Sequence, residues 1–588
     1  MILRNFANNK LRLLGTDNIP YILAVIVGVC SGLAAVMLKS SIHLVKDMLT
    51  GWFSLSEGSL LYFAYPGIGV LITILFVRYF VKDNINHGIT QVLYAISRNN
   101  SRIKSHNMYT SMIAGTFTIG FGGSVGAEAP IVMTGSAIGS AIGRFFRLNY
   151  RQITLLLGCG AAGAVSGIFK APLSGIIFTL EILMLNLSLS SIIPLTISSV
   201  TACGVSYFLI GSDVEFGNTL QKFAMNNIPY YVFLGIFCGF VSLYFTRATM
   251  FLEKKINRIH NPFYRWTTGA VSLGLLIYFL PPLYGEGYSM LTSVMTGNAS
   301  QIFEKSLFYD LQDSAWFFIL YILLILVFKV VAVSLTNGSG GVGGTFGPTL
   351  FMGGLAGFFV ARLINLSGIH PVPESNFALA GMAGAMSGVM QAPLTAIFLI
   401  AEITGGYTLL MPLMIVSVVS FITIRGFETY SIYTKRLAEK GDLLTYNKDK
   451  ATLTLLKLEN FIENDFVKVA PDDSFGKLLK AVSLSKRNIF PVIDSNNKIA
   501  GVVFLDDIRH LMFDSKHYST ITVKDKMKPV PDTIEINESM ESVTGKFDKT
   551  GAWNLPIVNE KGEYAGFVSK SKIFSAYREL LKELFGDE

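Results

Sequence analysis

The chain has 588 residues, of which 51% are hydrophobic and only 15% are charged, a composition typical of a membrane protein with many spans. The net charge is +8, and the basic residues lie mostly in short loops. This distribution fits cytoplasmic loops better than a nucleic-acid-binding stripe. The four cysteines lie in apolar segments without metal or redox spacing, so we expect neither a disulfide framework nor a metal site. The sequence contains no nucleophile–base pair or phosphate-binding loop that would indicate an enzyme.

The chain begins with a basic, amphipathic segment, for which we expect a cytosolic surface helix over residues 1–18. Apolar runs long enough to span a bilayer, about 20 residues each, then recur to about residue 424. The first two cover residues 19–47 and 59–81. The cationic residues before the first run predict that the N-terminus and the tail face the cytoplasm of an inner-membrane protein.

A glycine-rich bend, residues 122–130, opens an apolar helix over 131–143 and carries one carboxylate, Glu128. An ionisable side chain at membrane depth is costly, so it marks a functional site by default. A helix N-terminus offers unpaired N–H groups and about half a positive charge, and glycines let a ligand approach closely. The bend therefore predicts an anion site in which Glu128 mimics the anion and, once protonated and displaced, opens the path. Close packing of helices through small residues is the alternative.

The second half of the apolar region repeats the first. Residues 162–182 align with 383–403 at an offset of 221, with 11 of 21 positions identical. The bend 122–130 aligns with 340–348 at an offset of 218, where Phe346 replaces Glu128. Duplicated halves with broken helices at matching positions predict a site where helix N-termini meet near the membrane midplane. We place the two repeats at about residues 19–215 and 228–440.

Beyond residue 440 the chain becomes charge-rich. We interpret residues 441–457 as a linker and the remainder as a soluble tail. The pattern FPVIDSNNKIAGVVFLDDI at 490–508 recurs as LPIVNEKGEYAGFVSKSKI at 555–573, and each copy is typical of strand, turn, strand and helix. The tail is therefore expected to hold two small α/β modules, at about residues 458–515 and 522–588.

These motifs resemble the CLC family of chloride channels and proton-coupled chloride exchangers. The run Gly126 to Pro130 is similar to the family's gating motif G-[KR]-E-G-P, and Gly338 to Pro348 is similar to its GSGxxGGxFxP block. The resemblance covers residues 19–440, and the tail resembles a tandem CBS pair. It implies an all-α polytopic membrane domain with two inverted repeats and broken helices, followed by a cytosolic α/β tandem CBS module. It also implies a homodimer in the lipid bilayer with one pathway in each subunit.

The resemblance implies two anion sites on the path. The outer site would use the backbone around Ala127, Glu128 and Ala129. The central site would use the Thr345 and Phe346 amides, the Tyr433 hydroxyl and His87. Chloride itself is the ligand, and no cofactor, metal or catalytic residue is implied.

Three departures from the family pattern bear on function. His87 stands where a serine or another small residue normally faces the central anion, so its ring either donates a hydrogen bond to the anion or points elsewhere. Ala127 replaces a basic residue and Ala129 a glycine, which makes the entrance less positive. Glu181 fits the first of two acids in proton-coupled members and is a candidate internal acid, but Ile182 replaces the second and cannot titrate.

Glu402, the repeat equivalent of Glu181, is interpreted as a structural acid at a helix end.

Adenosine sites of CBS modules use a hydroxyl residue and, three positions later, an aspartate. The first module offers only Asp507 of this pair, after Phe504, and the second only Ser569, before Lys572. Adenine-nucleotide binding and a dimerising scaffold therefore both stay open.

The leading hypothesis is a chloride/proton exchanger gated by Glu128. A passive chloride channel is the alternative, favoured by Ile182, and a CBS-based sensor that has lost transport is a third. Selectivity among chloride, nitrate and fluoride and the stoichiometry stay open.

Overall fold

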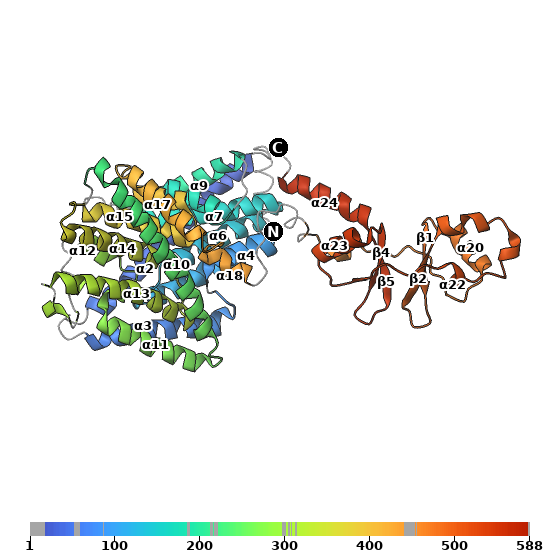
Figure 1. Ribbon diagram of the computed structural model, residues 1–588, viewed down its shortest axis with the longest axis horizontal. Helices are drawn as coiled ribbons and strands as arrows, with labels where there is room; N and C mark the ends of the chain where they lie inside the picture. Colours follow the sequence, from blue (N-terminus) through green and yellow to red (C-terminus); the bar gives the residue numbers. More distant parts are fainter. Residues whose placement is uncertain are drawn as a thin grey trace, which may run out of the picture. The chain divides into compact units, whose positions relative to one another are not determined.

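The structure, a computed structural model, describes residues 18–585 apart from 52–58, 86, 185–188, 212–215, 217–220, 297–301, 304–305, 307, 312–313, 440–452 and 454–455. The expected N-terminal helix and linker therefore lie almost entirely outside the described residues. The chain divides into two compact units, Met1–Leu443 and Leu444–Glu588 (Figure 1).

The regular elements of the first unit are helices, and among its described residues no β-strand is found. Its first half contains α2 Ile19–Gly51, α3 Ser59–Phe76, α4 Gly88–Arg98, α5 Asn107–Gly120, α6 Glu128–Phe145, α7 Tyr150–Phe169, α8 Pro172–Glu181 and α9 Leu189–Ile210. Its second half contains α10 Ile228–Asn257, α11 Pro262–Phe279, α12 Tyr288–Met295, α13 Ala315–Gly338, α14 Phe346–Ser367, α15 Glu374–Met390, α16 Pro393–Ile403, α17 Leu410–Arg425 and α18 Ile432–Ala438.

Helices of two kinds build this unit. Among the described residues, seven are long and apolar enough to cross a membrane, whereas α8, α16 and α17 are apolar but shorter. The predicted span 59–81 consists of α3 followed by a π-helical turn, Val77–Val81. Short helices with irregular joints are tolerated at membrane depth where other protein surrounds them.

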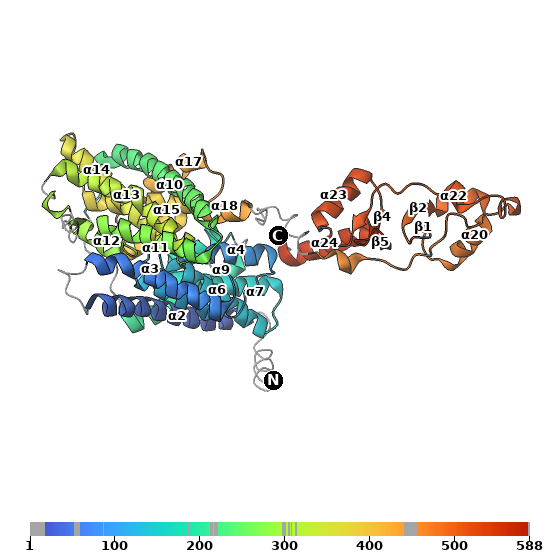
Figure 2. The same cartoon turned by 90° about the horizontal axis from the view of Figure 1, so that it is seen from below.

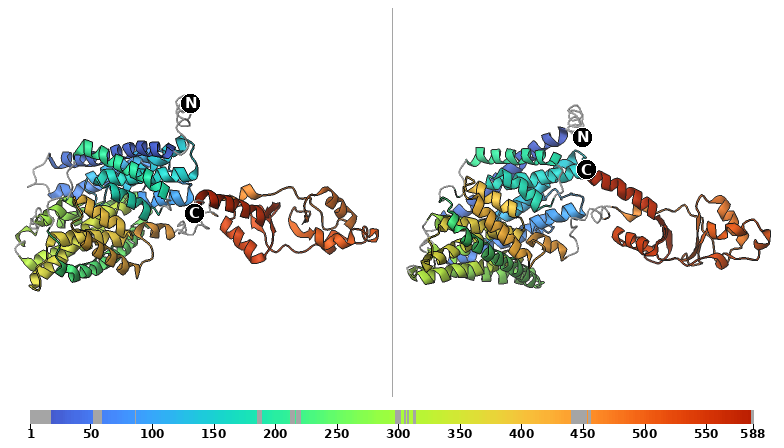
Figure 3. Two further views of the ribbon diagram at one scale, coloured as in Figure 1. Left: turned by 90° about the horizontal axis from the view of Figure 1, so that it is seen from above. Right: turned by 45° about the horizontal axis from the view of Figure 1, so that its top comes forward.

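The two halves of the chain gather on opposite sides of the unit. The helices of the first half, blue to cyan, lie on one side, and those of the second half, green to orange, lie on the other (Figures 2 and 3). The short helices α4 and α18 lie at one end of the unit and α12 at the other (Figures 1 and 2). This arrangement gives the site described below two distinct ends.

Equivalent glycines hold α6 against α7 and α14 against α15. A Cβ atom on Gly139 would lie 1.9 Å from the Leu156 carbonyl oxygen, and one on Gly357 would lie 1.9 Å from that of Phe377. Because neither position has room for a methyl group, close packing through small residues, the alternative considered for the bend, operates between these helices. A second pair in each half repeats the contact: Gly135 with Gly160, and Gly353 with Gly381.

The second unit contains two α/β modules. The first contains α20 Phe475–Leu484, β1 Ile489–Ile493, β2 Ile499–Phe504, α21 Leu505–Ile508 and α22 Val523–Lys526, and the second β3 Ile534–Glu535, α23 Met540–Thr550, β4 Asn554–Val558, β5 Tyr564–Ser569 and α24 Lys570–Phe585. The pairs β1–β2 and β4–β5 are antiparallel hairpins, and β3 runs parallel to β4. The hairpin turns have positive φ at Asn497 and Gly562, 65 residues apart, which confirms the predicted strand–turn–strand repeat.

Candidate functional site

The two repeat-equivalent bends meet in the interior of the first unit. The Gly126 N–H donates to the Gly344 carbonyl oxygen at 2.9 Å, and the Gly344 N–H donates back to Gly126 at 2.7 Å. These residues are 218 positions apart, the offset at which the bends align. Equivalent residues that exchange both hydrogen bonds in an antiparallel bridge are related by a local two-fold axis, as inverted repeats require.

Glu128, the first residue of α6, lies over this junction. Its side chain is buried, and its Oε1 accepts a hydrogen bond from the Tyr288 hydroxyl at 3.0 Å. A Cβ atom on Gly126 would lie 2.0 Å from Oε2, and one on Gly347 would lie 3.0 Å from Oε1, so the carboxylate occupies space that only glycines leave. Oε2 is buried without a hydrogen-bond partner. A buried polar atom left unpaired costs free energy, so it identifies a functional position better than a structural one.

The residues expected at the central site come from two elements. Thr345 precedes the first turn of α14, and its hydroxyl donates to the Tyr433 hydroxyl oxygen at 3.4 Å. Tyr433 is buried in the first turn of α18. The Phe346 ring packs against Phe169, with ring centroids 5.4 Å apart. The predicted neighbours Thr345, Phe346 and Tyr433 therefore lie together, beside a helix N-terminus whose N–H groups suit an anion.

His87 lies where α4 reaches the junction. A Cβ atom on Gly88 would lie 2.6 Å from the Ala129 carbonyl oxygen, so the start of α4 packs directly on the start of α6. The His87 ring nitrogen Nε2, however, lies 3.7 Å from Glu253 Oε2 on α10. Arg436 of α18 binds both oxygens of Glu253, at 2.8 and 3.0 Å. Of the two orientations considered from the sequence, this contact favours the ring facing an acid–base cluster.

The backbone expected at the outer site already has a protein partner. The Ala127 N–H donates to Glu286 Oε1 at 2.9 Å, so a carboxylate takes the place expected for an anion. Near it, the fully buried Lys329 of α13 donates to the Gly285 carbonyl oxygen at 2.9 Å. Neither residue was expected from the sequence. Lys329 had a signal, since it is the one charged side chain in the apolar run 315–338, whereas Glu286 had none.

Glu181 and Glu402 cap each other's helices across the two halves. Glu181, the last residue of α8, accepts from the Thr395 N–H at 2.7 Å and the Leu394 N–H at 3.0 Å, at the start of α16. Glu402 of α16 accepts from the Leu173 and Ser174 N–H groups, at 2.9 and 2.8 Å, at the start of α8. The sequence indicated different roles for these acids, but their contacts are equivalent.

The half-motifs of the tail have partners within the protein. Asp507 accepts a hydrogen bond from Lys528 Nζ at 2.8 Å. The hydroxyls of Ser569 and Ser571 lie 2.7 Å apart. Lys572 Nζ lies 3.5 Å from Glu463. The groups that would bind a ribose are therefore engaged in ion pairs and hydrogen bonds.

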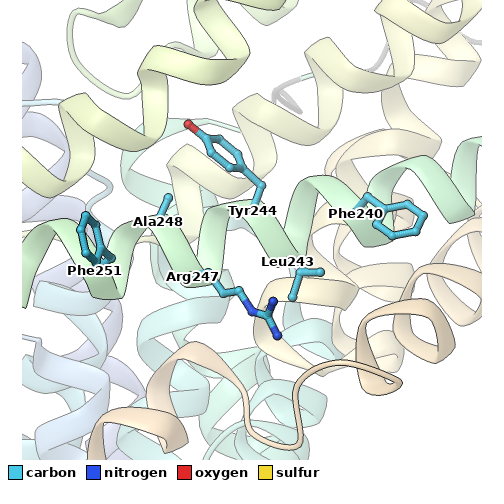
Figure 4. A pocket seen from close by; sticks show the side chains of 6 residues that line it. All are labelled: Phe240, Leu243, Tyr244, Arg247, Ala248 and Phe251. Carbon is cyan, nitrogen blue, oxygen red and sulfur yellow. The ribbon is translucent and has the colours of Figure 1, made fainter.

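A shallow groove on the outward face of α10 is a feature of a different kind (Figure 4). It is lined by Phe240, Leu243, Tyr244, Arg247, Ala248 and Phe251. Its polar groups bind protein, because the Tyr244 hydroxyl donates to the Val327 carbonyl oxygen at 2.9 Å and Arg247 Nε to Glu428 at 2.7 Å. The remaining apolar lining suits lipid chains.

Among the described residues, no cluster of three or more histidine, cysteine or acidic side chains could hold a metal ion.

Several known proteins are similar to this chain. The H(+)/Cl(-) exchange transporter ClcA of Vibrio parahaemolyticus is 28% identical over 433 residues, which cover 71% of this chain and 88% of that protein. The structure of a slow cyanobacterial Cl-/H+ antiporter matches 72% of this chain and 97% of its own, with a TM-score of 0.61 and 21% identity. A eukaryotic CLC transporter matches 94% of this chain and 97% of its own, with a TM-score of 0.61 and 17% identity.

At this low sequence identity the two structures show the fold alone, and they confirm the expected fold class. The family model of the CBS domain matches residues 458–514 and 523–579. The family model of the voltage gated chloride channel matches residues 68–425, more than half of the chain. The chain therefore belongs to the voltage gated chloride channel family and carries two CBS domains.

Proposed function

We propose that the protein is a chloride/proton exchanger in which the Glu128 carboxylate is the gate. The observation that carries this proposal is the position of that carboxylate, buried where the two bends exchange hydrogen bonds and with one oxygen unpaired. Protonation removes its charge, and its displacement leaves glycine backbone at two helix starts to bind the anion. The proton-coupled activity named for the Vibrio relative supports the same assignment.

The central anion would then lie among the Thr345 and Phe346 amides and the Tyr433 hydroxyl. Binding by amides and a hydroxyl, without a full positive charge, suits a pathway because it holds an anion without trapping it. We propose that the chain acts as a homodimer with one pathway in each subunit. The N-terminus and tail would face the cytoplasm of the inner membrane, with the CBS pair acting as a scaffold or a nucleotide sensor.

A passive chloride channel is the second candidate, and one observation favours it. Ile182 is buried and cannot titrate, and both oxygens of the neighbouring Glu181 accept hydrogen bonds from α16. A proton route on that side would need water or another acid. The reversal potential across a proton gradient separates the candidates, because only an exchanger shifts it with the gradient.

The decisive experiment measures chloride and proton flux together in liposomes, for the wild type and for Glu128→Gln. We expect the variant to keep chloride flux and lose proton flux, because glutamine fills the same space without carrying a proton. Glu374→Gln is the matched control, since this glutamate pairs with Arg362 at 3.1 Å on α14 and should leave both fluxes unchanged. Proton coupling that survives in Glu128→Gln would remove the gate role. Absence of anion flux at any pH, with nucleotide binding by the tail intact, would favour a sensor.

A further inference from the structure

The loop that leads into α12 is attached to the bend that carries Glu128. The Gly285 N–H donates to the Gly122 carbonyl oxygen at 3.0 Å. The Tyr284 ring covers Gly122, where a Cβ atom would lie 2.0 Å from a ring carbon, and Gly122 itself has a φ of +92°. Glu286 Oε1 then accepts the Ala127 N–H at 2.9 Å. Three consecutive residues therefore hold this loop on the entrance to α6.

A buried cation stabilises the loop from the other side. Lys329 is fully buried in α13, donates to the Gly285 carbonyl oxygen at 2.9 Å and lies 4.7 Å from the centroid of the Phe351 ring. It is also close enough to Glu286 for electrostatic attraction. A buried ammonium needs an opposite charge nearby, and Glu286 supplies it.

Glu286 occupies a position that suits an anion. The N–H group of Ala127 lies at the start of α6, where the helix dipole and unpaired amides favour a negative group. Glu286 precedes α12, at the end of the unit opposite α18, which carries Tyr433 (Figures 1 and 2). The loop before α12 and the helix α18 therefore approach the junction from opposite ends of the unit.

We propose that Glu286 is a second gating carboxylate, in series with Glu128, which must leave the Ala127 amide before an anion can bind there. Two charged groups interact with Glu286 electrostatically, Glu128 of α6 and Lys329 of α13. Tyr288 of α12, two positions after Glu286, donates to Glu128. When Glu286 moves away, Lys329 stays in place and its charge attracts the incoming anion. This inference rests on the proposed anion transport and adds a gate that the sequence does not reveal.

The first test measures chloride binding to the purified full chain by calorimetry, for the wild type, Glu286→Ala and the control Glu374→Gln. If Glu286 leaves the Ala127 amide in about one tenth of the molecules, removing this competing carboxylate should tighten chloride binding about tenfold. Glu286→Gln keeps the shape but lowers the charge, so its affinity should fall between the two. Equal affinities of the wild type and Glu286→Ala would overturn the second gate.

The second test measures chloride flux in liposomes. Glu286→Ala should raise chloride flux several-fold while the ratio of proton to chloride flux stays that of the wild type, because Glu128 is intact. An unchanged or lower chloride flux in a variant with wild-type thermal stability would overturn the proposal. If the wild type itself carries no chloride, the proposed function fails, whereas tighter binding in Glu286→Ala would still show that Glu286 competes with chloride for the Ala127 amide. Lys329→Met together with Glu286→Gln removes both charges, and its flux should lie below that of Glu286→Ala, because no buried cation then attracts the anion.

Discussion

The two halves of the membrane unit share a backbone framework and differ in the side chains that enter it. Gly126 and Gly344 exchange hydrogen bonds as equivalent residues. Over this shared junction the first half places Glu128, whereas the second half places Phe346 at the equivalent position. Positions where backbone approaches backbone have kept their residue types, and those whose side chains enter the junction have diverged. The proposed gate, Glu128, is therefore an asymmetric side chain on a symmetric backbone framework.

The two ends of the junction show the same contrast. At the end with α18, His87 and Arg436 surround Glu253. At the end with α12, Lys329 stabilises the loop from which Glu286 reaches the Ala127 amide. Each end has an acid and a base, but only the carboxylate of Glu286 binds an amide of the bends. This comparison predicts that substitutions in the shared backbone framework reduce stability equally in the two halves. Substitutions of the side chains that enter the junction should have different effects in the two halves.

The largest effect should come from filling the glycine contacts between helices. In Gly139→Ala and Gly357→Ala the new methyl group would meet a backbone carbonyl oxygen at 1.9 Å, which neither helix can avoid without moving. Each substitution should destabilise the protein by about 3 kcal/mol or more, as severe overpacking does. Thermal unfolding of the detergent-purified protein measures this loss, which should be similar in both halves.

Gly204→Ala in α9 is the control for helix propensity, because a Cβ atom there meets no atom within 4 Å. It should stabilise α9 by about 0.5–1 kcal/mol. A large loss in one half alone would show that the two helix pairs are not equivalent.

A smaller effect should follow from removing the exchanged caps. Glu181→Ala and Glu402→Ala each leave two N–H groups at the start of a helix without their acceptor, at a cost of about 1–2 kcal/mol. We expect equal losses of thermal stability and an unchanged ratio of proton to chloride flux in both variants. If Glu181→Ala alone abolished proton flux, this acid would serve the proton route as well as the cap.

The framework could be predicted from the sequence because it depends on short-range patterns. The aligned blocks 162–182 and 383–403 revealed the duplication, and a cluster of glycines around a single carboxylate identified the bend. Such patterns survive because a glycine that faces a carbonyl oxygen cannot be replaced.

The ends of the junction could not be predicted, because they depend on contacts between distant segments. Glu286 and Ala127 are 159 residues apart, and nothing in the loop around Glu286 indicates that it reaches α6. The exchange of Glu181 and Glu402 between helix starts likewise needs the two-fold axis, which sequence alignment implies but does not position. Lys329 could have been found by the argument that identified Glu128, a lone charge in an apolar run.

The smallest effect should appear in the tail, whose modules offer the same comparison outside the membrane. Asp473 and Glu538, 65 residues apart, precede α20 and α23 at equivalent positions. Burial alone would raise the pKa of Asp473, but hydrogen bonds from Lys477 and the Ala470 N–H lower it below 3.8. Burial opposes the shift at Glu538 too, where Ser542 and Lys546 lower the pKa below 4.5.

Because both carboxyls have depressed pKa values in the folded tail, each stabilises it fully above its unfolded pKa, and this contribution is lost as the pH falls through the folded value. Acidification below pH 3.8, which lies under the ordinary pKa of both carboxyls, should therefore weaken the first turns of α20 and α23 together. Amide hydrogen exchange of the full chain measures this loss for each segment, with the wild type and the variants compared at the same pH. Asp473→Asn should weaken α20 alone, and Glu538→Gln should weaken α23 alone, each at neutral pH and with little further loss on acidification. A variant whose two helices responded equally would show that the modules unfold as one unit, so that their repeat is one of sequence and not of stability.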